Sequence, residues 1–127
     1  MDRNERKLLL KAQQGELDAV LMYQALAKVV RDKNDAETFL RLAAEEGRHA
    51  AVFKQQTGQT LRPKKTLATL LPVLYKLVGR KRLYPMIAKG EYAAVKTYEP
   101  VAAFFPEVRA VRDDEKRHGD TVMELIR

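Results

Sequence analysis

Long helix-forming stretches separated by a few short breaks make up the chain. The main breaks are DKND (32–35), TGQT (57–60), RPKK (62–65) and FFP (104–106). Because Gly, Pro, Asn and Asp mark helix ends and turns, the pattern predicts four long helices near 3–32, 35–57, 83–103 and 106–127 and a shorter one near 67–80. No stretch alternates apolar and polar residues as a strand would. We therefore predict an all-α protein.

Each long helix has one apolar face, because apolar residues recur three and four positions apart. Near its middle, each apolar face is interrupted by glutamate or histidine. The interruptions are Glu16, Glu46, His49, Glu91, Glu115 and His118. A buried carboxylate costs several kcal/mol unless its charge is compensated, and no Lys or Arg lies on these faces. Two divalent cations would balance four carboxylates and leave two neutral imidazoles as further ligands.

Both histidines of the chain end a Glu-x-Arg-His unit, in EEGRH (45–49) and in DEKRH (114–118). The sequence is also duplicated: GELDAVLMYQALA (15–27) aligns without gaps with GEYAAVKTYEPVA (90–102), and a Glu-x-Arg-His unit follows each copy. We interpret the copies as two helical hairpins related by a pseudo-twofold. In antiparallel helices, residues lie at one level when their midpoint falls at the turn. The midpoints between Glu16 and either Glu46 or His49 fall beside DKND, and those between Glu91 and either Glu115 or His118 fall beside FFP. All six residues are therefore expected to meet in one layer.

A simpler interpretation is that each histidine forms a surface ion pair with the glutamate three residues before it, as helices often allow. That interpretation does not explain why both pairs lie on apolar faces and in duplicate. We therefore favour a metal site.

The net charge of +7 comes from one segment. Between Gly58 and Tyr84 there are seven Lys and Arg residues and no Asp or Glu, so elsewhere the charges cancel. The short apolar helix in this segment, with basic residues 62–82 around it, could lie on an anionic membrane or dock an acidic partner. Equally, its apolar face could pack back onto the other helices. We do not expect the segment to bind nucleic acid.

Absent cysteine excludes disulfides and thiolate metal sites, so any metal must be held by His, Glu and Asp. The N-terminal MDRNERKLLL is too charged for a secretory signal, and the apolar run at 67–78 is too short to span a bilayer. We expect one cytoplasmic domain over residues 1–127, which could associate with a membrane surface through the basic segment.

One Glu from each of two helices and Glu-x-x-His from each of two others is the arrangement of di-iron carboxylate bundles. The sequence resembles the rubrerythrin branch of the ferritin-like superfamily. The resemblance rests on Glu16 seven residues before Tyr23, then on AEEGRHA, GEYAAVKTYEP and DDEKRH. In the linking segment and in EVRAVRDDEKRHGDTVMELI it is especially similar to the rubrerythrin-like domain fused to vacuolar-iron-transporter-type membrane proteins.

The resemblance implies a ferritin-like four-helix bundle with a long crossover that contains the short extra helix. It also implies two iron ions, although manganese or a mixed pair would suit the same ligands. Glu46 and Glu115 would bridge the ions, Glu16 and Glu91 would be terminal ligands, and His49 and His118 would each bind one ion. Tyr23 and Tyr98 match tyrosines that hydrogen-bond the ligand carboxylates, and Glu45 and Asp114 match acids that orient the histidines.

The implied function is binding of Fe(II) and its reaction with O2 or H2O2, with an external electron donor and a homodimeric assembly. Ala94 departs from the family pattern, because peroxidase-type rubrerythrins carry an extra Glu there, and the chain lacks the rubredoxin domain. Both departures argue against a peroxidase. The alternative is a non-catalytic module that senses iron or delivers it to a membrane iron transporter. Either role uses the same six ligands.

Overall fold

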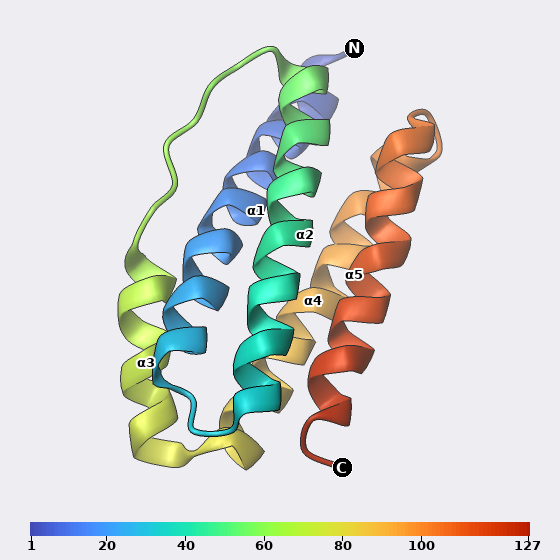
Figure 1. Cartoon of the computed structure of the whole chain (residues 1–127). Helices are drawn as coiled ribbons and strands as arrows, with labels where there is room; N and C mark the ends of the chain where they lie inside the picture. Colours follow the sequence, from blue (N-terminus) through green and yellow to red (C-terminus); the bar gives the residue numbers. More distant parts are fainter. The chain divides into compact units, whose positions relative to one another are not determined.

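A computed structural model describes residues 1–127 as five α-helices, without any strand (Figure 1). The helices are α1 (Arg3–Val29), α2 (Lys33–Thr57), α3 (Thr66–Val78), α4 (Arg80–Ala102) and α5 (Pro106–Glu124). The predicted all-α class is confirmed. The chain divides into two compact units, Leu9–Leu77 and Val78–Arg127 with Met1–Leu8, which we call the N-terminal unit and the C-terminal unit. Each unit contains one copy of the duplicated sequence.

The first turn of the chain lies a few residues earlier than the sequence pattern predicts. α1 ends at Val29, three residues early, because Asp32 is the N-cap of α2. The backbone of Asp32 is extended, and Asp32 Oδ1 accepts a hydrogen bond from the Asp35 amide at 3.0 Å. Such a cap satisfies one of the amide groups left over at a helix start. α2 ends at Thr57 and is capped by Gly58, whose φ of 68° is a left-handed conformation that glycine adopts without strain.

α3 and α4 are separated by a single residue, Gly79. Its φ of 77° breaks the helical path, so α4 begins at Arg80 rather than near residue 83. α5 begins at Pro106, where proline's missing amide hydrogen is not needed, and ends at Glu124. No helix of the structure combines the length and the apolar character needed to cross a membrane.

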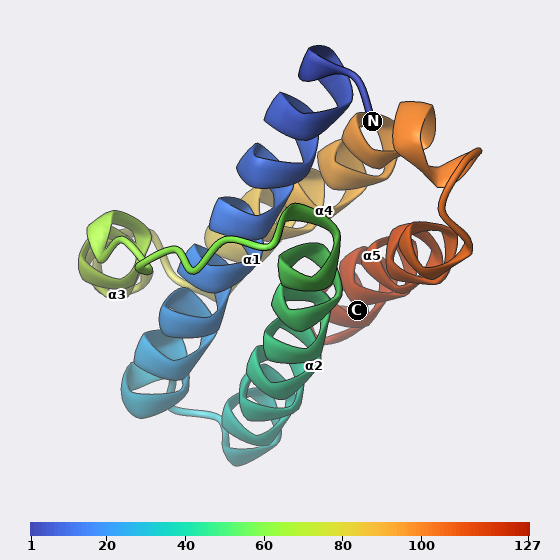
Figure 2. The ribbon, with the colours of Figure 1, turned by 90° about the horizontal axis from the view of Figure 1, so that it is seen from above.

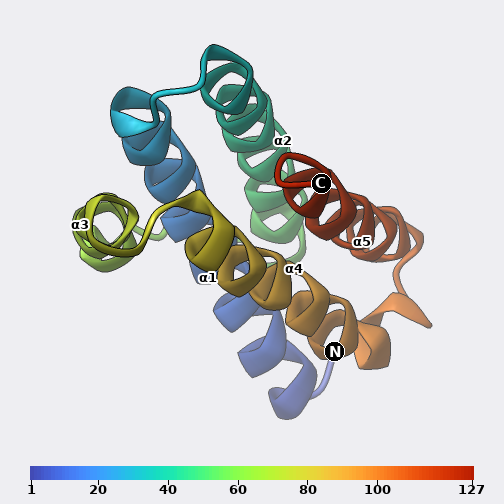
Figure 3. The same cartoon turned by 90° about the horizontal axis from the view of Figure 1, so that it is seen from below.

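In the N-terminal unit, α1 and α2 form an antiparallel hairpin around a core of aliphatic and aromatic residues. Tyr23 of α1 stacks on Phe39 of α2 with ring centroids 5.6 Å apart, and both are fully buried. Figures 2 and 3 show α3 beside α1, on the side away from α2. The Tyr75 hydroxyl of α3 accepts a hydrogen bond from the Arg31 amide at 3.0 Å. α3 is thereby held at the end of α1.

The segment that joins α2 to α3 is attached to α1 along its length. Gln14 Nε2 donates a hydrogen bond to the Arg62 carbonyl at 2.8 Å, and the Lys64 amide donates to Asp18 Oδ1 at 2.6 Å. This segment and α3 together form the long crossover with its extra helix that the sequence predicted. In the C-terminal unit, α4 and α5 pack along each other and bury mainly Leu, Val, Ile and Tyr side chains.

Candidate metal centre

Three ligand-type residues meet inside the N-terminal unit. Glu16 lies on α1, and Glu46 and His49 lie one turn apart on α2. His49 Nδ1 is 3.4 Å from Glu16 Oε2 and 3.1 Å from Glu46 Oε1. The three atoms are buried between the two helices. The 3-residue spacing of Glu46 and His49 places both on the face of α2 that is turned toward α1.

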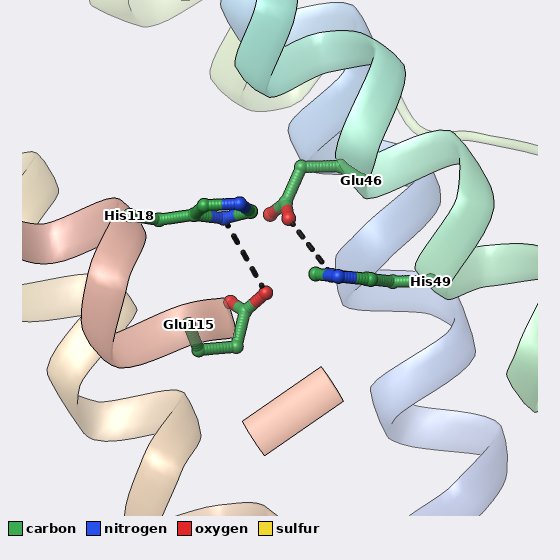
Figure 4. A group of neighbouring side chains, drawn as sticks. All are labelled: Glu46, His49, Glu115 and His118. Atoms are coloured by element: carbon green, nitrogen blue, oxygen red, sulfur yellow. Dashed lines mark ion pairs between the residues drawn. The ribbon is translucent and has the colours of Figure 1, made fainter. Parts of the chain in front are cut away.

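The C-terminal unit repeats this arrangement with Glu91 on α4 and with Glu115 and His118 on α5. His118 Nδ1 is 3.7 Å from Glu91 Oε2 and 3.6 Å from Glu115 Oε1. Figure 4 shows the Glu46–His49 pair on α2 and the Glu115–His118 pair on α5. In each unit, the imidazole Nδ1 therefore faces one carboxylate from its own helix and one from the neighbouring helix of the hairpin.

The four nitrogen–oxygen distances fit ligands that share a metal ion. Two ligands bound at about 2.1 Å, with about 90–120° between them, lie about 3.0–3.6 Å apart. Three of the observed distances between imidazole and carboxylate atoms, 3.1, 3.4 and 3.6 Å, fall in this range, and the fourth, 3.7 Å, lies just above it. The two His118 distances are too long for good hydrogen bonds.

The burial of the six side chains places negative charge inside the protein. The six side chains belong to residues that are at most 6% exposed, and four of them are carboxylates. Ionised carboxylates at such positions need compensating positive charge, because removal from water costs several kcal/mol per ion. Two divalent cations would supply four positive charges and would accept imidazole nitrogen as a ligand. Glu46 and His49 in the N-terminal unit, and Glu115 and His118 in the C-terminal unit, are buried residues of the types that hold metal ions, and such residues fit a di-iron site.

The two tyrosines expected to support the carboxylates are both buried. Tyr23 lies two turns after Glu16 on α1, and Tyr98 lies two turns after Glu91 on α4. A spacing of seven residues keeps each tyrosine on the same helix face as its glutamate. Tyr23 also contributes to packing through its stacking on Phe39. Their hydrogen bonding to metal ligands stays a prediction.

Glu45 and Asp114, the acids that precede the two Glu-x-x-His units, are half-buried rather than solvated. Asp114 Oδ1 accepts a hydrogen bond from Arg117 Nη2 at 2.8 Å, so the Arg of the second Glu-x-Arg-His unit pairs with this acid. The orienting role of both acids stays a prediction.

Sequence reasoning overlooked a group beside the C-terminal ligands. Tyr92, next to Glu91, donates a hydrogen bond from its hydroxyl to Asp120 Oδ1 at 2.6 Å, and Lys116 donates to Asp120 Oδ2 at 2.8 Å. The hydrogen bond to Asp120 raises the pKa of the Tyr92 phenol. The hydrogen bonds from Lys116, and then from Tyr92, lower the pKa of the Asp120 carboxyl.

Tyr92 also packs directly on Gly119, which follows His118 in α5. A Cβ at residue 119 would lie 2.4 Å from a Tyr92 ring carbon, so any other residue would force the ring or the helix to shift. The sequence could have indicated this contact, because both of its residues differ between the two copies. The first copy has Leu17 and Ala50 at the positions where the second has Tyr92 and Gly119.

Comparison with protein-family models gives one match, to a model described as "Rubrerythrin", over residues 7–126. The matched range contains all six candidate ligands. Neither the curated proteins nor the solved structures include a significant match.

Proposed function

The chain belongs to the rubrerythrin family, and from that premise we propose that it is a di-iron carboxylate protein that binds Fe(II) and reacts it with O2 or peroxide. One observation carries this proposal. Each unit brings a glutamate and a Glu-x-x-His pair together with the imidazole Nδ1 facing both carboxylates. A hairpin that served only as a scaffold would have apolar residues at these buried positions.

The ligand roles follow the family resemblance. Glu46 and Glu115 would bridge the two ions, Glu16 and Glu91 would be terminal ligands, and His49 and His118 would each bind one ion. Carboxylates bind both Fe(II) and Fe(III) well, and six ligands on two ions leave positions open for an oxidant. The ligand chemistry also accommodates manganese or a mixed pair.

Bound ferrous iron would supply the reducing electrons, and the residues of the chain would control access and charge. Burial of the ligand atoms keeps bulk water away from the reacting positions. Tyr23 and Tyr98 would hold the terminal carboxylates in place, and Glu45 and Asp114 would hold the imidazoles. An electron donor outside the chain would return the iron to the ferrous state.

An anaerobic Fe(II) titration followed by gel filtration and metal analysis tests the proposal. We expect about two irons per chain. Glu46→Ala and Glu115→Ala should each lose both irons, because each removes a bridging ligand. Glu99→Ala, which removes an exposed carboxylate of α4, is the matched control and should keep both irons. One iron per chain, or two irons in the Glu46→Ala variant, would contradict a dinuclear site.

A second candidate function is iron sensing or delivery to a membrane iron transporter, without turnover. It is favoured by the sequence similarity to transporter-fused domains and by the exposed apolar and basic residues of the crossover. The fusion to a transporter is itself a prediction. Rapid mixing of ferrous protein with O2 and excess Fe(II) separates the two functions. An enzyme oxidises many irons per chain, whereas a sensor or delivery module oxidises no more than it binds.

A further inference from the structure

α3 is apolar on both of its faces. Its inner face contacts the rest of the N-terminal unit through buried Leu71 and through the Tyr75 hydroxyl. Its outer face carries Leu70, Val73 and Leu77, of which Leu77 is 74% exposed. These three recur at a spacing of three and four residues, so they form one row along the helix. We call them the outer row.

Large exposed apolar residues are concentrated on this helix. Nine such residues exist in the chain, and five of them lie in α3 although it has only 13 residues. The other four, at positions 1, 40, 86 and 104, are scattered along the sequence. Isolated exposed leucines need no explanation, whereas a continuous row indicates a surface that contacts something apolar.

Basic residues accompany the outer row from one end to the other. Arg62, Lys64 and Lys65 precede α3, and Lys76 lies within it; all four are exposed. Gly79 then leads directly to the basic run Arg80–Arg82. No acidic residue occurs between Gly58 and Tyr84, and the nearby Asp18 engages the backbone amide of Lys64 rather than its ammonium group.

The crossover holds this surface in place before any partner arrives. Hydrogen bonds attach Arg62 and Lys64 to α1, and the Tyr75 hydroxyl receives the Arg31 amide. Figure 2 shows α3 on the outside of α1, with the joining segment passing over α1. Because α3 is already folded and attached to α1, binding of a partner does not require the ordering of a flexible segment.

We propose that α3 and the basic residues around it bind an anionic membrane surface. The helix lies in the plane of the headgroups with the outer row directed into the acyl boundary, and the Lys and Arg side chains contact phosphate groups. At about 1.5 Å per residue, α3 is about 20 Å long and contacts one leaflet only. The proposal is independent of the metal centre.

Two other occupants fit less well. A second copy of the chain would bring the same basic residues together across a twofold contact, with no acid in the segment to pair with them. An acidic protein would match the charges. However, apart from Lys76, only Thr66 and Thr69 add hydrogen-bonding groups to the exposed face of α3, so it offers little directional recognition.

Vesicle flotation tests the proposal with phosphatidylcholine vesicles that either contain or lack phosphatidylserine. The intact chain should float with the anionic vesicles only, and added salt should release it. Leu70→Gln with Leu77→Gln should weaken binding at least about tenfold, and so should Lys64→Glu with Lys65→Glu. Circular dichroism verifies that these exposed substitutions leave the fold intact.

Matched controls make the same changes elsewhere. Leu40→Gln with Phe104→Gln replaces two exposed apolar residues outside α3, and Lys7→Glu with Lys11→Glu changes the net charge equally on α1. Both controls should bind like the parent. Three results would overturn the proposal. They are no flotation of the intact chain, a loss of vesicle binding in a control pair equal to that in the α3 variants, and salt-independent binding to neutral vesicles. The protein could instead fail to float and form a dimer that dissociates when Leu70 and Leu77 are both changed to Gln. That result would make α3 an interface between copies of the chain.

Discussion

Gly119 of α5 packs closely against the Tyr92 ring of α4. The Tyr92 ring occupies the space where a side chain at residue 119 would begin. We predict that Gly119→Ala lowers the free energy of unfolding by about 1–3 kcal/mol, because either the ring or the helix must move. Urea denaturation of the metal-free protein measures the change.

Two further variants separate this clash from a general effect of alanine. Gly90→Ala, in the same unit, places its methyl group in open space and should stabilise the protein by about 0.5–1 kcal/mol through helix propensity. Tyr92→Leu, which copies Leu17 of the first repeat, should remove most of the cost of Gly119→Ala. An undiminished cost in the Tyr92→Leu background would mean that the ring is not its cause.

Ala94 permits a prediction about oxidant preference. It lies on α4 one turn after Glu91 and is half-buried. A Glu at this position would offer a ligand that the iron could exchange for histidine as its oxidation state changes, as the family resemblance implies. Ala94→Glu should therefore raise the rate with peroxide relative to the rate with O2. Stopped-flow oxidation of the ferrous protein measures both rates, with Ala93→Glu, at an exposed neighbouring position, as the control. A parent already faster with peroxide by orders of magnitude would contradict the prediction.

At the scale of elements, the crossover depends on a small buried polar group. Thr57 Oγ1 at the end of α2 donates a hydrogen bond to Gln13 Oε1 at 2.6 Å, and Gln13 Nε2 donates to the Gln59 carbonyl at 2.7 Å. Gln13 is 1% exposed and Thr57 is 5% exposed, so the hydrogen bond between their side chains is buried. This pairing determines where the chain leaves α2 and turns toward α3.

Replacing Gln13 alone should lower the free energy of unfolding more than replacing both Gln13 and Thr57. We predict that Gln13→Leu destabilises the protein by about 1–3 kcal/mol, because the buried Thr57 hydroxyl loses the acceptor of its hydrogen bond. Adding Thr57→Val should recover part of the loss. Gln24→Leu, an exposed position on the same helix, is the control and should change stability by less than about 0.5 kcal/mol. Thermal denaturation of the four proteins decides whether the two residues act as a pair.

For the molecule as a whole, metal binding by the buried carboxylates should stabilise the fold. Metal-loaded protein should be more stable than metal-free protein, by about 2.7 kcal/mol when free metal is one hundred times its Kd. In the metal-free state, replacing Glu16, Glu46, Glu91 and Glu115 with leucine should raise stability, because apolar residues suit buried positions better than carboxylates do. Calorimetry with and without a chelator measures both effects. A melting temperature that the chelator leaves unchanged would contradict the metal site.

Much about the molecule follows from the sequence alone. The spacing of apolar residues determined the all-α class and the approximate helices, because a helix face is a local property of the chain. The six glutamates and histidines were recognisable since they interrupt those faces in duplicate, and the family match confirms the rubrerythrin resemblance and the ferritin-like fold. The ligand assignment itself stays a prediction.

Tertiary structure decided features that depend on which surfaces meet. Leu70 and Leu71 are equally apolar in sequence, yet Leu70 faces solvent and Leu71 is buried, because only one side of α3 lies against the rest of its unit. Gly119 and Tyr92 are 27 residues apart, and their contact arises only when α5 packs along α4. Periodicity specifies the face that a helix buries, but the partner that covers it is a non-local outcome of packing.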